Sequence, residues 1–203
     1  ELIGIGTNLT CYGGVIPKYE NLNRLVKIKK DIEKRFDIKL GIISGGNSSS
    51  LYLLKTGEIP EEINQLRLGE SIVLGRETAY GKNIEDTYDD CFKLVVEIIE
   101  VKEKPSVPIG EIGMDAFGNT PTFIDKGIVK RAICAIGKQD IDLGDIISYD
   151  KDIEILGASS DHLILDITKS KISYEVGDKI KFKLTYGGIL KVMTSEYVAK
   201  NYI

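Results

Sequence analysis

The first 75 residues alternate short apolar runs with one amphipathic segment, and this order constrains the fold more than any other feature. Residues 20–36 carry apolar side chains at the i, i+3 and i+4 spacing of a helix. Three short runs predict strands, at residues 2–8, 40–43 and 63–69. Strands separated by helices form parallel sheets through right-handed crossovers. We therefore expect three βα units in residues 1–85, an α/β arrangement.

From Phe92 onward the sequence changes character, with apolar runs separated by turn residues such as Gly144-Asp145 and Gly177-Asp178. The predicted strands cover residues 94–101, 130–136, 152–156, 163–167 and 179–184. Closely spaced strands with turns between them favour antiparallel pairing. The chain is thus predicted to be α/β plus all-β, with an antiparallel, barrel-like β-domain over residues 86–203.

The net charge and the lengths of the apolar runs argue against two classes of partner. A net charge of −4 gives no basic field for a polyanion, and no apolar run approaches the roughly 20 residues that span a bilayer. We expect neither a nucleic-acid nor a membrane partner. Three widely spaced cysteines, Cys11, Cys91 and Cys134, indicate buried thiols in a reducing cytoplasm, and a single histidine excludes a multi-histidine metal centre within this chain. The chain starts at Glu1 directly before a strand pattern, which we interpret as a piece of a longer protein.

Two segments at predicted strand ends carry glycine and serine. Residues 44–50 read Ser-Gly-Gly-Asn-Ser-Ser-Ser, and residues 67–71 read Arg-Leu-Gly-Glu-Ser. Glycine lets the backbone approach a ligand, and a helix N-terminus favours an anion. Successive strand-end loops form the phosphate site of many (β/α)8 barrels. The alternative is that both segments only cap helices.

These segments, with Gly4-Ile5-Gly6-Thr7-Asn8 and the β-domain, resemble the fold-type III amino-acid racemases, which depend on pyridoxal 5'-phosphate (PLP). Residues 43–50, 108–118 and 156–162 are similar to the ornithine/alanine racemase branch. The resemblance implies that the chain holds the C-terminal three βα units of a (β/α)8 barrel, a TIM-type barrel, with its complete β-domain. It also places the lysine that binds PLP upstream of this chain.

Carried over position by position, the resemblance implies a set of site residues. Ser48, the amides of Gly69 and Glu70, and Tyr186 would bind the PLP phosphate. Arg67 would face the pyridine nitrogen; a guanidinium does not readily give up its proton, so that nitrogen stays neutral and transamination is limited. The full set implied by the resemblance comprises, for the cofactor, Asn8, Asn47, Ser48, Arg67, Gly69, Glu70 and Tyr186, and, for the substrate, Ser160 and Asp161.

The sequence departs from the family pattern near the second proton-transfer group. Phe117-Gly118 stands where the family has Tyr-Gly, and phenylalanine cannot transfer a proton. Asp115 is the catalytic candidate, because partial burial can raise the pKa of a carboxyl group. Its alternative role is to cap the turn at Gly118. Lys138 stands where the family has a tyrosine that lines the entrance to the active site.

We therefore expect the intact protein to racemise an amino acid, with a basic one such as ornithine preferred over alanine, as a cytoplasmic homodimer with its active site at the subunit interface. This chain alone is expected to be inactive. The alternatives are a non-catalytic PLP-binding protein and a ligand-free, β-rich assembly module. The sequence does not name the substrate.

Overall fold

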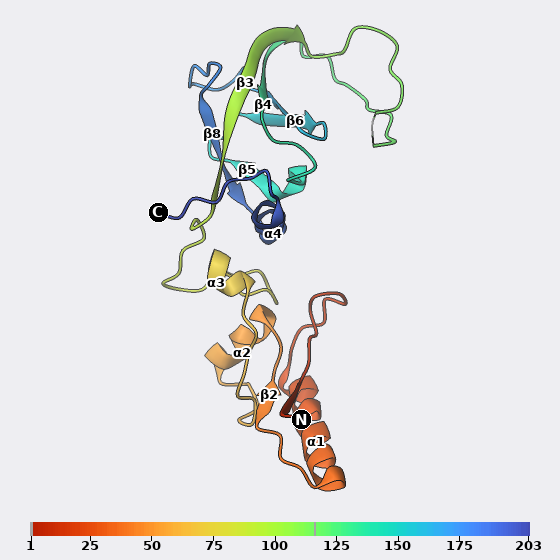
Figure 1. Cartoon of the computed structure of the whole chain (residues 1–203), viewed down its shortest axis with the longest axis vertical. Coiled ribbons are helices and arrows are strands. Elements are labelled where there is room, and N and C mark those ends of the chain that lie inside the picture. Colours follow the sequence, from red (N-terminus) through yellow and green to blue (C-terminus); the bar gives the residue numbers. More distant parts are fainter. Residues whose placement is uncertain (1, 116) are drawn as a thin grey trace. The chain divides into compact units, whose positions relative to one another are not determined.

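The computed structural model describes residues 2–115 and 117–203, and it divides into two compact units, Glu1–Cys91 and Phe92–Ile203 (Figure 1). The predicted domain boundary after residue 85 stays a prediction. Within the described residues, no helix is long and apolar enough to span a bilayer.

Over its described residues, 2–91, the first unit contains two short strands and three α-helices. Helix α1 has the predicted extent almost to the residue, and Leu25 and Val26 on its apolar face pack against Ile43. The elements in chain order are β1 (Gly4–Gly6), α1 (Tyr19–Phe36), β2 (Ile42–Ser44), the 3₁₀ turn η1 (Ser48–Ser50), α2 (Leu51–Thr56) and α3 (Glu70–Leu74).

β1 and β2 are parallel, with Gly4 opposite Ile42, as the βα order predicts. The predicted third strand at residues 63–69 is reduced to one parallel bridge, between Ser44 and Gln65. The side chain of Asn64 explains this difference. Its carbonyl accepts from the Ile43 amide at 2.9 Å, and its NH₂ group donates to the Gly41 carbonyl at 2.8 Å. A side chain thus takes ladder positions that a backbone strand would use.

The second unit is built on a six-stranded antiparallel sheet in the order β5-β8-β3-β4-β7-β6 (Figure 1). The sheet is curled, with β5 and β6 at its two edges. The elements of the second unit, in chain order, are β3 (Lys93–Pro105), β4 (Ile128–Cys134), the 3₁₀ turn η2 (Leu143–Asp145), β5 (Ile146–Ser148), β6 (Glu154–Ala158), β7 (Leu163–Asp166), β8 (Lys179–Leu184) and α4 (Tyr186–Thr194).

Strand alternation produces the core of this unit. In β8, Ile180, Phe182 and Leu184 are buried, and in β3 the buried residues are Leu94, Val96 and Ile98. Period-2 burial is the pattern of a sheet that buries one face. Of the three cysteines expected to be buried, only Cys134, at the end of β4, is buried, and desolvation raises the pKa of its thiol to about 12; Cys11 and Cys91 are exposed, so the expectation was wrong for them.

Helix α4 was not among the elements predicted from the sequence, and its first turn contains Gly187 and Gly188. Both glycines instead allow close packing: a Cβ at Gly187 would lie 2.7 Å from Asp145 Oδ2, and one at Gly188 would lie 2.8 Å from the Asp145 carbonyl oxygen. Thr185 is the N-cap and accepts from the Gly188 amide at 3.3 Å. The second unit is therefore mainly, and not entirely, β.

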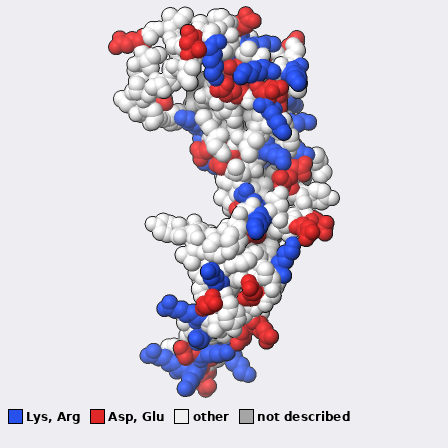
Figure 2. Space-filling view, turned by 180° about the vertical axis from the view of Figure 1, so that it is seen from behind, with Lys and Arg blue, Asp and Glu red and all other residues white. Residues whose placement is uncertain are grey.

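Acidic and basic side chains are interspersed on the face shown in Figure 2. In β3, for example, Lys102 and Lys104 both bind Glu100 at 2.6 Å, and their hydrogen bonds lower the pKa of this partly exposed carboxyl group to about 2. Exposed pairs of this kind add little stability.

Candidate functional site

In the first unit, three segments meet at the carboxyl ends of the parallel strands. The Thr7 amide after β1 donates to the Ser44 carbonyl at 3.0 Å, and the Arg67 amide donates to the Gly46 carbonyl at 2.8 Å. Gly46 has a φ of +112°, a conformation that favours glycine. Segments far apart in sequence are thus brought together at one edge of the sheet, where α/β folds bind their ligands.

Ser48 connects two of these segments. Its Oγ accepts from the Gly69 amide at 3.3 Å and from the Ser71 amide at 3.1 Å, and its hydroxyl donates to Ser71 Oγ at 3.1 Å. Ser48 and Ser71 are both buried. The structure thus brings Ser48 and the Gly69 amide, two of the predicted site groups, into contact. What binds there stays a prediction.

Arg67 is held by the other two strand ends. One guanidinium nitrogen, Nη1, donates to Ser44 Oγ, and the other, Nη2, donates to the Thr7 carbonyl at 2.8 Å. A Cβ on Gly6 would lie 3.2 Å from Nη1, so glycine at this position leaves room for the guanidinium. The Arg67 side chain is therefore fixed by the protein itself.

Asn8 and Asn47 also lie together. The Asn47 side-chain amide donates to Asn8 Oδ1 at 3.2 Å, and both amides donate to Cys11 Sγ at 3.2 Å. Asn47 is also the N-cap of η1, where it accepts from the Ser49 amide at 2.8 Å. The capping role and the predicted cofactor role of Asn47 are compatible.

Glu70 follows Gly69 as the first residue of α3. Its carboxylate does not reach back to Ser48 in this structure: Oε1 accepts from Arg76 Nε at 2.9 Å and also from Arg76 Nη2. The Glu70 side chain is 15% exposed and that of Arg76 41%. The negative charge at the start of α3 is thus paired with a cation.

In the second unit, the predicted substrate segment packs against a glycine. The Lys138 amide donates to the Ser159 carbonyl, and the Gln139 amide to the Ser160 carbonyl, both at 2.9 Å. Ser160 Oγ donates to Asp161 Oδ1 at 3.1 Å. Hydrogen bonds, first that from Ser159, lower the pKa of the exposed Asp161 carboxyl group. These bonds therefore favour the anionic form of Asp161, which attracts cationic groups of a ligand and repels anionic ones.

The spacing between these segments requires Gly137. A Cβ there would come within 3.0 Å of backbone atoms of Ser160 and Asp161. Gly137→Ala should lower the free energy of unfolding by about 1–3 kcal/mol, the usual cost of overpacking. Denaturant unfolding measures the change. Gly144→Ala is the matched control, since nothing lies within 4 Å of its Cβ; equal costs at both positions would contradict the packing argument.

Asp115 does not have the environment that was expected for a catalytic acid. It is exposed, and its Oδ1 accepts from the Asn119 amide at 2.8 Å and the Phe117 amide at 2.9 Å. These hydrogen bonds, that from Asn119 first, lower the pKa of the carboxyl group. The expected rise in pKa is wrong, because the carboxyl group is solvated and stabilised as an anion. The geometry is that of a turn cap, and the catalytic role stays a prediction without this support.

Phe117 and Lys138, the two departures from the family pattern, are in contact. Lys138 Nζ lies 3.6 Å from the centre of the Phe117 ring, a cation–π geometry.

Tyr186 is the first residue of α4. Its proposed contact with a phosphate stays a prediction.

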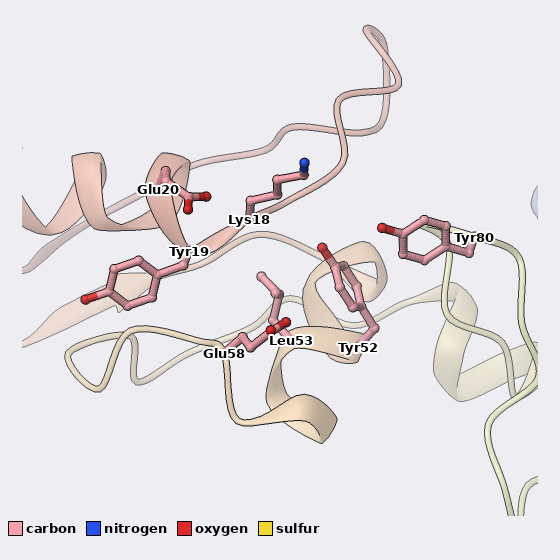
Figure 3. Close-up of a pocket in the computed structure, with 7 residues that line it drawn as sticks. All are labelled: Lys18, Tyr19, Glu20, Tyr52, Leu53, Glu58 and Tyr80. Atoms are coloured by element: carbon pink, nitrogen blue, oxygen red, sulfur yellow. The ribbon is translucent and has the colours of Figure 1, made fainter.

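A cavity of about 390 Å³ lies elsewhere in the first unit (Figure 3). Tyr52 and Tyr80 meet edge to face at its wall, with ring centres 5.2 Å apart, and burial raises the pKa of Tyr52 to about 12. The cavity contains none of the predicted site residues. It is lined by Lys18, Tyr19, Glu20, Tyr52, Leu53, Glu58 and Tyr80.

Sequence reasoning missed four participants. Ser44 and the Thr7 carbonyl hold Arg67, Ser71 bonds to Ser48, and Arg76 pairs with Glu70. Ser44 and Ser71 stand inside the two segments singled out from the sequence. Arg76 had no such signal, since only the turn after α3 brings it back to Glu70.

The comparisons with known proteins concern the sequence family and the fold. No protein-family model matches the chain. It is 58% identical over 200 residues to ornithine racemase of Acetoanaerobium sticklandii and 51% identical over 202 residues to lysine racemase of Thermotoga maritima. These alignments cover 98% and 100% of the chain, and the chain spans 57% of the length of each relative.

Solved structures share the fold. Alanine racemase of Bartonella henselae, with covalently bound pyridoxal phosphate, aligns with a TM-score of 0.59 and 18% identity over 96% of this chain and 51% of that one. Alanine racemase of E. faecalis aligns with a TM-score of 0.58 and 15% identity over 94% and 51%. On its identity to the two curated racemases, the chain corresponds to the C-terminal part of a fold-type III PLP-dependent racemase. Within that class, its sequence is similar to both the ornithine racemase and the lysine racemase.

Proposed function

We propose that the full-length protein is a PLP-dependent racemase of a basic amino acid, ornithine or lysine. The observation that carries the proposal is the meeting of Ser48 with the amides at the start of α3, beside a fixed Arg67. The names of the two relatives support the substrate class. In this proposal residues 1–85 complete a (β/α)8 barrel with upstream residues, and residues 86–203 form the β-domain.

The donor set fits the phosphate of PLP. Ser48 and Ser71 supply hydroxyl groups that can rotate to donate, and the Gly69 and Glu70 backbone amides lie at the same turn. The one carboxylate in this turn, that of Glu70, is paired with Arg76. A phosphate would replace the bond between the two serine hydroxyls. Tyr186 is proposed as a further donor from the second unit.

PLP, when bound, supplies an electron sink that weakens the bond between Cα and its hydrogen. Arg67 would limit how strong that sink becomes. Its guanidinium donates to Ser44 and Thr7, and because a guanidinium does not readily give up its proton, Arg67 would offer the pyridine nitrogen a hydrogen bond without protonating it. Proton exchange at Cα is then favoured over transamination. Asn8 and Asn47 are proposed to contact the cofactor beside Arg67.

Ser160 and Asp161 are proposed to contact the substrate in a homodimer whose active site lies at the subunit interface. Because hydrogen bonds favour the anionic form of the Asp161 carboxyl group, it suits the cationic end of ornithine or lysine, whereas the Ser160 hydroxyl is the group of this segment that could donate to a substrate carboxylate. Asp115 remains the proposed second proton-transfer group. A reducing, cytoplasmic location is part of the same proposal.

Two measurements on the full-length protein test the function. Apoprotein mixed with PLP should gain the visible absorbance of a protein-bound cofactor, and L-ornithine or L-lysine should then lose optical rotation. Absorbance without loss of rotation would favour the non-catalytic PLP-binding alternative. Absence of both would favour the ligand-free module. The purified 203-residue chain is expected to racemise neither amino acid.

A further inference from the structure

The charge of Glu70 presents a problem for the proposed phosphate site. Ser48 Oγ is bonded to the amides on either side of Glu70, those of Gly69 and Ser71. A carboxylate at this turn repels a phosphate dianion, and burial of Ser48 and Ser71 reduces the screening of that repulsion by solvent. The turn can hold an anion only if the charge of Glu70 is compensated.

Arg76 provides the compensation. Two of its guanidinium nitrogens, Nε and Nη2, donate to the same Glu70 oxygen, Oε1. Glycine at position 75, with a φ of +59°, ends α3 and turns the chain directly before Arg76. The Glu70 side chain is largely buried, at 15% exposure, so its carboxylate is better shielded from solvent than that of Glu85 in the Lys55–Glu85 pair, which is 83% exposed.

Resting on the proposed function, we propose that Arg76 is a positioning residue of the phosphate site. It neutralises Glu70 and holds its carboxylate away from Ser48, so that a phosphate can bind at the start of α3. Arg76 itself touches neither the phosphate nor the pyridine ring in this proposal. Its effect on binding is therefore confined to ligands that carry a phosphate.

Comparing PLP with pyridoxal, which lacks the phosphate, isolates this effect. Apoprotein of the full-length wild type and of Arg76→Gln is titrated with each compound, followed by visible absorbance. Arg76→Gln should weaken PLP binding about tenfold, equivalent to about 1.4 kcal/mol, and should change pyridoxal binding less than twofold. Inorganic phosphate should compete with PLP in the wild type and compete less well in the variant.

Two variants control for loss of folding. Glu70→Gln/Arg76→Gln removes both charges and should recover most of the lost PLP affinity, because no uncompensated carboxylate remains. Lys55→Gln removes the cation of an exposed pair in the same unit and should leave both titrations unchanged. Thermal unfolding of all variants is measured in parallel.

The outcomes separate this inference from the proposed function. A wild type that binds pyridoxal as tightly as PLP overturns the phosphate site itself. A wild type that prefers PLP, with Arg76→Gln keeping that preference, overturns the role of Arg76 alone. Equal loss of PLP and pyridoxal in Arg76→Gln, or no recovery in the double variant, likewise overturns it, since the pair would then only stabilise the turn.

Discussion

Phe182→Ala should lower the free energy of unfolding of the second unit by about 3–5 kcal/mol, the range for removing a large aromatic side chain from a core. Phe182 is fully buried in the middle of β8, a strand that pairs with both β3 and β5. Loss of the ring removes its buried apolar area and leaves a cavity that the paired strands cannot close. Denaturant unfolding followed by circular dichroism measures the change.

Ile147→Ala is the control for this prediction, because Ile147 in β5 is more than half exposed. Its substitution should change the free energy of unfolding by no more than about 0.5 kcal/mol. A similar, small change in both variants would mean that the sheet does not bury Phe182 as described.

Arg67→Glu should raise the ratio of transamination to racemisation in the full-length protein by at least about tenfold, which corresponds to 1.4 kcal/mol in the relative barriers. A carboxyl group can give the pyridine nitrogen a proton, and a protonated ring is a stronger electron sink. The substitution also removes the donors to Ser44 Oγ and the Thr7 carbonyl. Product analysis by chromatography measures both reactions.

Arg67→Lys distinguishes charge from geometry. Lysine keeps the cation but lacks the planar fork of donors that reaches Ser44 and Thr7 together. We expect it to retain a low transamination ratio while PLP binds more weakly. An unchanged product ratio in Arg67→Glu would count against the position of Arg67 beside the pyridine nitrogen.

Sequence periodicity predicts best those elements whose own apolar residues repeat with one regular period. Helix α1 and strand β8 were expected with nearly the observed bounds, because their apolar residues follow one period throughout. The prediction of a third strand at residues 63–69 was wrong, because Asn64 bonds to the β2 segment through its side chain. Helix α4 was missed because its two glycines reflect the nearness of Asp145, a residue of another element.

In the candidate site, too, some features could be predicted from the sequence and others could not. The glycine and serine segments were found from their order in the chain, and the approach of Ser48 to Gly69 followed from parallel strands that end at one edge. The pKa of Asp115 was predicted in the wrong direction, because nothing in its sequence indicates that two backbone amides surround the carboxylate. The partners of Arg67 could not be predicted, because they lie at the ends of β1 and β2, far from Arg67 in the sequence.

The buried thiol at the end of β4 gives this protein an internal reporter of unfolding. Cys11 and Cys91 are exposed and Cys134 is not, and a thiol whose pKa is about 12 is nearly all protonated and unreactive at neutral pH. An alkylating reagent should therefore modify two cysteines quickly and the third only when the curled sheet opens. The slow labelling rate then gives the opening free energy of that sheet in the native protein, without any introduced probe.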